Sequence, residues 1–267
     1  MEKTPSIEND YQFCGLISGM KRYKTIKLGP ESINNRSIVE ITGEAGTGKS
    51  KLCYYFALKT ILPEKYGGLE KSCLFITSFK ALSDEQKVEF FENPVKSLGL
   101  SEEEIESTLK RLVYRHFNFE EFQRFINENF EKFLVENKIQ TIIIDNITCL
   151  CDEKFQEMKK YDYPGRHNFL FDFFLVFDGL LLKYNLFCFC VNEVRALLAH
   201  EVVMMMNSDN KSRPAMGKTW ENNLGTRLFL KRIKEINKRW IVVSFSNYLI
   251  REYMEFQITE NGIQFLD

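Results

Sequence analysis

The sequence predicts one α/β domain, in which a mostly parallel central sheet is flanked by helices and continues into antiparallel C-terminal strands. From residue 37 onward, apolar segments typical of buried strands alternate with helical segments, which is the pattern of a doubly wound sheet. After residue 225, strand-like segments follow one another with only short turns between them, which favours antiparallel pairing. A chain of 267 residues can bury one substantial core. We therefore assign residues 37–267 to a core domain and residues 1–36, which show little periodicity, to an N-terminal extension.

The apolar pattern also gives the order of the elements. A strand at 37–42 leads through a glycine-rich turn into an apolar helix at 52–62, which Pro63 ends. The other expected elements are strands at 72–77, 112–117, 141–145, 186–192, 226–233, 239–246, 252–258 and 263–266, helices at 83–111, 119–135 and 168–184, and irregular segments at 152–167 and 196–217.

Composition limits the classes of function. The formal net charge is −1, so the overall charge does not indicate nucleic-acid binding, and any such site must be local. No run of about 18 apolar residues occurs, so we expect no membrane-spanning helix. The N-terminal residues MEKTPSIEND are polar and acidic, unlike a signal or transit peptide. These features together predict a cytosolic or nuclear protein.

The glycine-rich turn carries the clearest chemical signal in the chain. It fits the pattern G-x-x-x-x-G-K-[ST], whose backbone N–H groups cradle phosphates, whose lysine contacts the β- and γ-phosphates and whose hydroxyl binds Mg²⁺. The alternative is a glycine-rich surface turn, but a strand before the pattern and a helix after it favour the phosphate loop. The predicted nucleotide-binding residues are Gly43, Glu44, Ala45, Gly46, Thr47, Gly48, Lys49 and Ser50.

A second signal lies at the end of the most apolar predicted strand. Asp145 follows the run Thr141 to Ile144, and its position is that of the carboxylate that holds magnesium beside a phosphate loop. An aspartate that only forms a turn after a strand is the alternative. Together with the phosphate loop, the pattern predicts Mg²⁺ bound by Ser50 and Asp145.

Several motifs occur in the same order as in a known family. Ser37 to Cys53 resembles its phosphate loop and following helix, Thr141 to Leu150 its magnesium strand, and Val191 to Val194 its Asn-Gln-Val sensor. Pro214 to Trp220, with Arg227 beyond, resembles a P-A-L-G…W…R pattern of its paralogues. The chain thus resembles the RecA-like recombinases of eukaryotes and archaea, particularly the recombinase paralogues that act as recombination mediators. The resemblance implies a RecA-like ATPase core that uses ATP and Mg²⁺.

Two departures from the family concern hydrolysis. The glutamate that activates water corresponds here to Phe79, which has no proton acceptor, and loss of a general base costs roughly 10²–10⁴ in rate. The sensor glutamine corresponds to Glu193, and a carboxylate repels a triphosphate unless it is protonated, paired or pointed away. Glu193 is also the possible substitute base. We therefore expect ATP to bind and to be hydrolysed weakly.

The resemblance places two DNA-binding loops at residues 161–166 and 196–213. Arg166, Lys211 and Arg213 fall in these loops and are the predicted DNA-binding residues. Residues 211–239 are locally basic, with nine Lys or Arg against two acids, which favours a DNA-facing side. Solvated strand and hairpin faces are the alternative explanation of this charge.

The implied function is that of a nuclear, ATP-binding recombinase paralogue in homologous-recombination DNA repair. It would bind and stabilise or remodel a recombinase filament on single-stranded DNA, and no membrane is expected among its partners. The implied partners are the filament and another recombinase paralogue or small subunit. A competent DNA-dependent ATPase that uses Glu193 or another acid as base, and a pure scaffold, are the alternatives.

Overall fold

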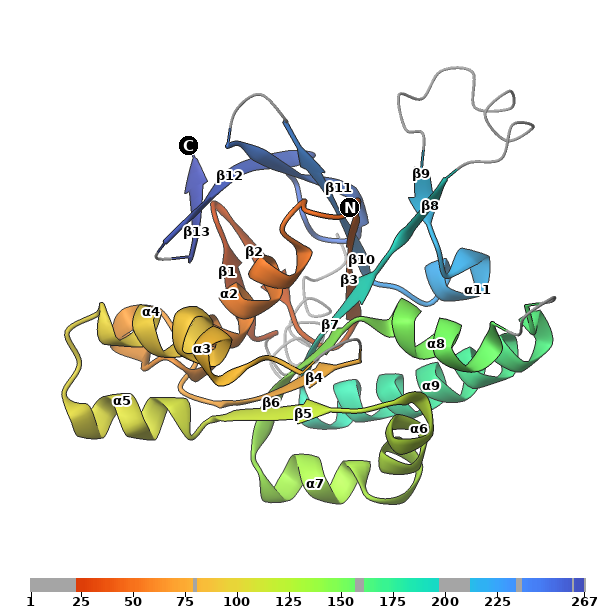
Figure 1. Ribbon diagram of the computed structural model, residues 1–267, viewed down its shortest axis with the longest axis horizontal. Coiled ribbons are helices and arrows are strands. Elements are labelled where there is room, and N and C mark those ends of the chain that lie inside the picture. Colours follow the sequence, from red (N-terminus) through yellow and green to blue (C-terminus); the bar gives the residue numbers. More distant parts are fainter. Residues whose placement is uncertain are drawn as a thin grey trace, which may run out of the picture.

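The computed structural model describes residues 23–78, 81–156, 161–196, 212–233, 237–260 and 262–266. Within these residues, the centre of the protein is a nine-stranded sheet with the order β13-β12-β11-β10-β3-β7-β6-β4-β5 (Figure 1). Its strands are β3 (Ile38–Gly43), β4 (Ser72–Thr77), β5 (Leu112–His116), β6 (Ile139–Asp145), β7 (Phe187–Asn192), β10 (Thr226–Arg232), β11 (Arg239–Ser246), β12 (Tyr253–Thr259) and β13 (Gly262–Leu266).

In the part of the sheet ordered β10-β3-β7-β6-β4-β5, all neighbouring strands are parallel. In the part ordered β10-β11-β12-β13, all neighbouring strands are antiparallel. The predicted fold class is therefore confirmed. In the parallel part, Thr42 lies opposite Asn192, and Thr77 lies opposite Asp145. The carboxyl ends of β3, β7, β6 and β4 thus meet at one edge, where ligands of open α/β sheets bind.

Two helical layers cover the faces of the sheet, and the strands alternate between them. Ile142 and Ile144 of β6 pack with the helices of one face, whereas Ile143 packs with α2 on the other. Figure 1 shows α6 and α7 below the sheet and α2 above it. The main covering helices are α2 (Lys49–Ile61), α6 (Phe119–Glu128), α7 (Phe130–Glu136), α8 (Ile147–Phe155) and α9 (Tyr163–Tyr184).

Two predicted helices are broken. The segment expected as one helix at 83–111 divides because Gly99, with φ +70°, ends the preceding turn and the capping box of Ser101 begins a new helix. The segment at 119–135 breaks at Asn129, whose φ of −134° is not helical. The pieces of the first segment are α3 (Asp84–Lys87), the π-helical turn η2 (Val88–Glu92), α4 (Asn93–Lys96) and α5 (Glu102–Leu109).

The expectation of irregular structure at 152–167 is partly wrong. Helix α8 continues to Phe155, and α9 already begins at Tyr163. The reason is local: the Asp162 side chain accepts a hydrogen bond from Gly165 N at 3.0 Å, and Pro164 lies in the first turn, where its missing N–H costs nothing.

A short hairpin of β1 (Thr25–Leu28) and β2 (Glu31–Asn34) lies within the segment predicted as an N-terminal extension. Its Ile26, Leu28 and Ile33 side chains are buried in the same cluster as α2. The division into an extension and a core domain stays a prediction. No helix of the described residues is long and apolar enough to cross a membrane.

Candidate nucleotide-binding site

The loop between β3 and α2 has a backbone that requires glycine. Gly46 and Gly48 have φ of +77° and +104°, a region that other residues rarely adopt. A Cβ on Gly43 would lie 2.4 Å from the carbonyl oxygen of Leu230. The Thr47 hydroxyl donates to the Glu44 carbonyl at 2.8 Å and closes the turn. The loop therefore leads directly into the N-terminus of a 13-residue helix, whose free amides and dipole favour an anion.

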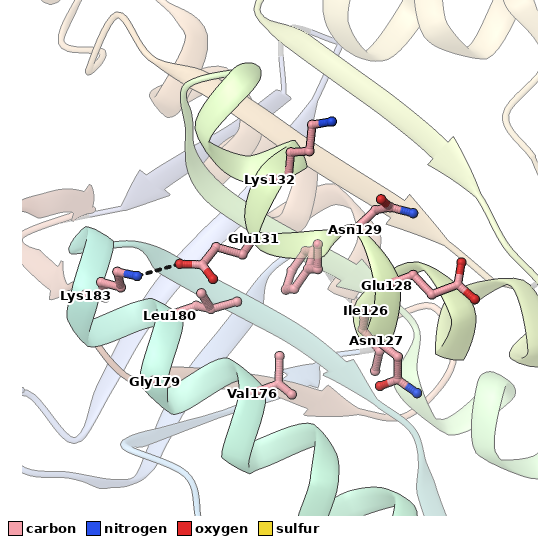
Figure 2. Close-up of a pocket in the computed structure, with 11 residues that line it drawn as sticks. Ile126, Asn127, Glu128, Asn129, Glu131, Lys132, Val176, Gly179, Leu180 and Lys183 are labelled. Atoms are coloured by element: carbon pink, nitrogen blue, oxygen red, sulfur yellow. Dashed lines mark hydrogen bonds and ion pairs between the residues drawn. The ribbon is translucent and has the colours of Figure 1, made fainter.

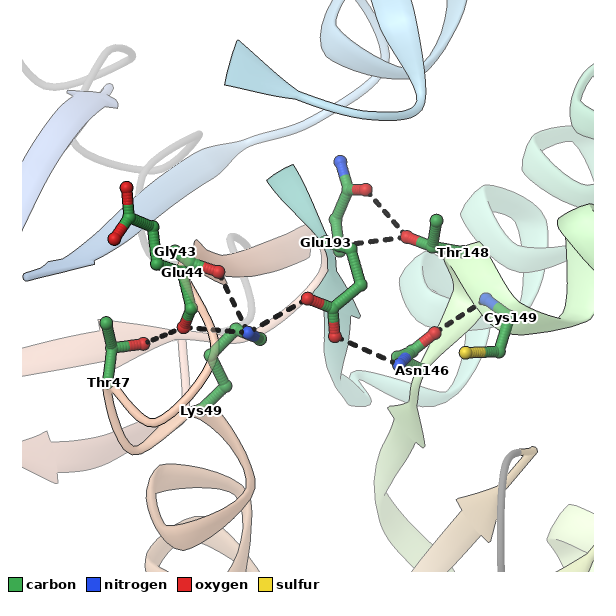
Figure 3. Close-up of polar contacts among 9 residues, drawn as sticks. Gly43, Glu44, Thr47, Lys49, Asn146, Thr148, Cys149 and Glu193 are labelled. Atoms are coloured by element: carbon green, nitrogen blue, oxygen red, sulfur yellow. Dashed lines mark hydrogen bonds and ion pairs between the residues drawn. The ribbon is translucent and has the colours of Figure 1, made fainter. Parts of the chain in front are cut away.

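Lys49 is buried at the first position of α2, and its ammonium group lies at the centre of the site. Its Nζ donates to the carbonyl oxygens of Gly43 at 2.8 Å and Glu44 at 3.1 Å. It also forms an ion pair with Oε2 of Glu193 at 3.1 Å (Figure 3). The three N–H donors of the ammonium thus face three oxygen atoms.

Asp145 and Ser50 lie together beside Lys49. Burial raises the pKa of the Asp145 carboxyl, whereas the hydrogen bond with Ser50 and the charge of Lys49 act in the opposite direction. A poorly solvated carboxylate beside a hydroxyl offers the oxygen ligands that Mg²⁺ prefers, and a cation there would offset the cost of burying the charge. The two predicted magnesium ligands therefore fit the ion.

Glu193 follows β7 and is fixed by its neighbours. Its Oε1 accepts a hydrogen bond from Nδ2 of Asn146 at 3.2 Å, and its backbone N–H donates to the Thr148 hydroxyl at 2.9 Å. Asn146 is itself held, because its Oδ1 accepts from Cys149 N at 2.6 Å. The structure thus decides among the possibilities open for this carboxylate: it is paired, and it points into the site.

These groups line one cavity of about 610 Å³, within the usual range for small-molecule sites. It joins the phosphate loop to the ends of β4, β6 and β7, and Ile258 of β12 closes one side. Its lining residues are Ala45, Gly46, Gly48, Lys49, Ser50, Lys51, Tyr54, Thr77, Leu82, Asp145, Asn146, Cys149, Glu193 and Ile258.

A second hollow of about 590 Å³ lies between the α6–α7 turn and α9 (Figure 2). Gly179, Leu180 and Lys183 line it near the end of α9, shortly before β7 begins, so this hollow lies toward the amino ends of the strands, away from the phosphate loop. Glu131 and Lys183 pair with each other there at 2.6 Å, so each satisfies the charge of the other. The groups suited to nucleotide chemistry belong to the first cavity.

A buried polar network behind the site is not predicted from the sequence. Glu40 of β3 is fully buried, and its Oε1 accepts from Asn192 Nδ2 at 2.5 Å and from Trp220 Nε1 at 2.8 Å. Its Oε2 accepts from Nε of Arg227, whose Nη1 donates to Glu221 at 2.8 Å. A single charged residue inside the apolar run SIVEIT was the available signal. The network joins β3, β7, β10 and α11 (Gly217–Glu221).

Arg166 lies in an aromatic cluster at the start of α9. Its guanidinium lies over the rings of Tyr161 and Tyr163, at 5.0 and 5.4 Å from their centroids. Arg195 of β8 (Val194–Ala196) stacks on the same Tyr161 ring at 5.4 Å, and its register partner in β9 (Ser212–Pro214) is Arg213. The structure therefore brings two of the predicted DNA-binding residues to neighbouring elements.

The structure limits two sets of predictions, those at Lys211 and Phe79 and the one from the local charge of residues 211–239. Lys211 and Phe79 lie outside the described residues. Arg227 and Arg239 are buried, so the local charge counted over residues 211–239 overstates what this segment shows to a ligand.

A phosphate loop between β3 and α2, with an acid at the end of a nearby parallel strand, is the arrangement of the phosphate-loop class of α/β folds. A family model described as Rad51 matches residues 12–266, so the chain belongs to the Rad51 family.

Two relatives support the assignment to the RecA-like recombinase paralogues. The chain is 24% identical over 243 residues to the human protein named DNA repair protein RAD51 homolog 2, covering 85% of this chain and 63% of the relative. It is 22% identical over 261 residues to DNA repair protein XRCC3 homolog of Arabidopsis thaliana, covering 85% of this chain and 86% of the relative. The chain therefore spans less than two thirds of the length of the human relative.

Proposed function

We propose that this chain is a nucleotide-binding recombinase paralogue that assists homologous-recombination DNA repair in the nucleus. It binds and stabilises or remodels a recombinase filament on single-stranded DNA. The names of both relatives support a role in DNA repair. The observation that carries the proposal is the cavity in which Lys49, Ser50 and Asp145 meet at the end of a complete phosphate loop.

ATP is the proposed nucleotide, with Mg²⁺ as its ion. The loop residues 43–50 would hold the phosphates, and Ser50 with Asp145 would hold the magnesium. The bound ion neutralises phosphate charge. The chain's own groups would bind and orient the nucleotide: the free amides at the start of α2 would hold the phosphates, and Lys49 would supply one buried positive charge.

Weak hydrolysis follows from the state of Glu193. A general base must be free to accept a proton from water, but both Glu193 oxygens already contact Lys49 or Asn146. This pairing favours a nucleotide that orders the structure over one that is turned over rapidly. The DNA-dependent ATPase remains the second candidate, since the Glu193 side chain is 37% exposed and reachable by water.

Single-stranded DNA would bind at the Arg166 cluster and the β8–β9 hairpin. Arginine with tyrosine rings is suited to backbone phosphates and stacked bases. Nη1 of Arg166 is buried and has no hydrogen-bond partner among the described residues. A phosphate could reach this nitrogen only after the side chain moves, so the arginine charge and the tyrosine rings carry this part of the proposal.

The outer face of α9 supports the proposal that a partner chain binds this protein. Phe171, Leu175 and Leu182 are spaced by four and seven residues, so they share one side of the helix, and all are exposed. Apolar side chains gathered on one exposed face are typical of protein–protein contacts. The proposed occupant is the filament, another paralogue or a small subunit.

The proposal predicts that the chain with ATP and Mg²⁺ prolongs the lifetime of a recombinase filament on single-stranded DNA. The measurement is filament decay after dilution, using the recombinase of the same organism. Lys49→Ala should lose the effect, while Lys110→Ala, on the exposed end of α5, should retain it.

Thermal melting of the chain separates the two parts of this proposal. Nucleotide at 100 times its Kd should stabilise the fold by about 2.7 kcal/mol, a rise in Tm of roughly 5–10 °C, and Lys49→Ala should abolish the rise. Absence of the rise in the wild type would reject nucleotide binding. A normal rise with unchanged filament lifetime would reject the accessory role.

A further inference from the structure

The Glu193–Lys49 ion pair lies in the space that a triphosphate must enter. The lysine of a phosphate loop contacts the β- and γ-phosphates of a bound nucleotide. Here Lys49 Nζ is instead held by two loop carbonyls and by Oε2 of Glu193 at 3.1 Å. Since the ammonium has three N–H donors, a phosphate oxygen can bind it only by replacing or crowding one of these acceptors.

The direction of approach identifies which phosphate Glu193 opposes. The loop and the first amides of α2 surround the position of the β-phosphate from one side. Glu193 and Asn146 come from the ends of β7 and β6 on the opposite side, and Lys49 lies between them and the loop (Figure 3). A diphosphate therefore fits on the loop side of Lys49, whereas a third phosphate extends toward the Glu193 carboxylate.

Glu193 is also held in this position. Asn146 donates to its Oε1 at 3.2 Å, and Thr148 anchors its backbone N–H at 2.9 Å. A terminal phosphate would have to break the ion pair, displace the carboxylate from Asn146, or remain beside a like charge. A diphosphate can reach Lys49 by replacing the loop carbonyls of Gly43 and Glu44, so the costs at Glu193 fall on the third phosphate alone.

We propose that Glu193 stands in for the γ-phosphate and makes the site selective for nucleoside diphosphates over triphosphates. This inference rests on the proposed nucleotide function and names the favoured ligand of that site. ATP still binds, with lower affinity than ADP. We expect the preference for ADP to be at least about tenfold, which corresponds to about 1.4 kcal/mol.

The test is isothermal titration of the full chain with ADP and with the β,γ-imido analogue of ATP, at the same Mg²⁺ concentration. Wild type should bind ADP more tightly. Glu193→Gln keeps the size of the side chain and an acceptor for Asn146 but removes the charge, so it should tighten the triphosphate analogue about tenfold and leave ADP nearly unchanged. Glu128→Gln removes the same charge from the exposed surface of α6 and should change neither affinity.

The outcomes are distinguishable. Equal affinities in the wild type, or a Glu193→Gln variant that tightens both ligands equally, would overturn the inference while nucleotide binding stands. Failure of the wild type to bind either ligand would instead reject the proposed nucleotide function. Circular dichroism of each variant shows whether it is folded. If Glu193→Gln does not fold, Glu193→Asp takes its place in the test. Glu193→Asp keeps the charge on a shorter side chain and should therefore retain a preference for ADP.

Discussion

Replacement of Glu40 by glutamine is expected to reduce the free energy of unfolding by about 3 kcal/mol, because it breaks a buried ion pair from one side. Glu40 is fully buried and accepts hydrogen bonds from Asn192, Trp220 and Arg227. Glutamine keeps the volume but loses the charge, and its NH₂ group would face donors. Arg227 keeps its contact with Glu221, so the lower end of the usual 3–5 kcal/mol range is expected.

The assay is equilibrium unfolding in urea, with the stability taken from the midpoint and slope. Glu106→Gln is the matched control, because Glu106 pairs with Lys110 on the exposed surface of α5, where ion pairs contribute about 0–1 kcal/mol. Trp220→Phe removes a single donor to Glu40 and should cost about 1–3 kcal/mol. If the free energy of unfolding of Glu40→Gln lies within about 1 kcal/mol of the wild-type value, the network does not stabilise the sheet.

Two further predictions concern activity and DNA. ATP turnover should stay slow even with single-stranded DNA, because Glu193 is occupied by Lys49 and Asn146; a DNA-stimulated phosphate-release rate that Glu193→Ala abolishes would favour the ATPase instead. Binding of single-stranded DNA, followed by fluorescence anisotropy, should weaken as salt rises, and the double variant Arg166→Ala with Arg213→Ala should weaken it further and reduce the salt dependence. Unchanged binding by the double variant would show that DNA does not bind at this cluster.

The parts of the site that are local in sequence could be predicted. The phosphate loop, the helix after it and the acid at the end of β6 each follow from a short pattern, because glycine conformations, capping and strand ends are decided by neighbouring residues. The parallel sheet also follows from the apolar alternation. The phosphate loop and its helix are thus encoded in one segment, whereas the assignment of Asp145 also needs the loop, and the sheet needs the alternation along the chain.

The parts that depend on strand order could not be predicted. The resemblance placed Glu193 near the triphosphate, but its ion pair with Lys49 was not predicted, because it depends on β7 lying between β3 and β6, an order that no local pattern specifies. The burial of Arg227 has the same origin, since its partner Glu40 is far away in the sequence and on the adjacent strand. The hairpin β1–β2 was missed because four-residue strands are too short to show a period, although the core buries three of their side chains.

The Glu40 network and the nucleotide cavity share one chain of hydrogen bonds. Asn192 donates its Nδ2 to Glu40, and its Oδ1 accepts from the Thr148 hydroxyl at 2.8 Å. The same hydroxyl accepts from the backbone N–H of Glu193 at 2.9 Å. The buried carboxylate thus fixes the orientation of the Asn192 amide, and through Thr148 it fixes the backbone from which the Glu193 side chain reaches Lys49. A Glu40 variant that still folds should therefore loosen the Glu193–Lys49 pair and reduce the preference for ADP, so stability of the core and selectivity of the site are set by the same side chains.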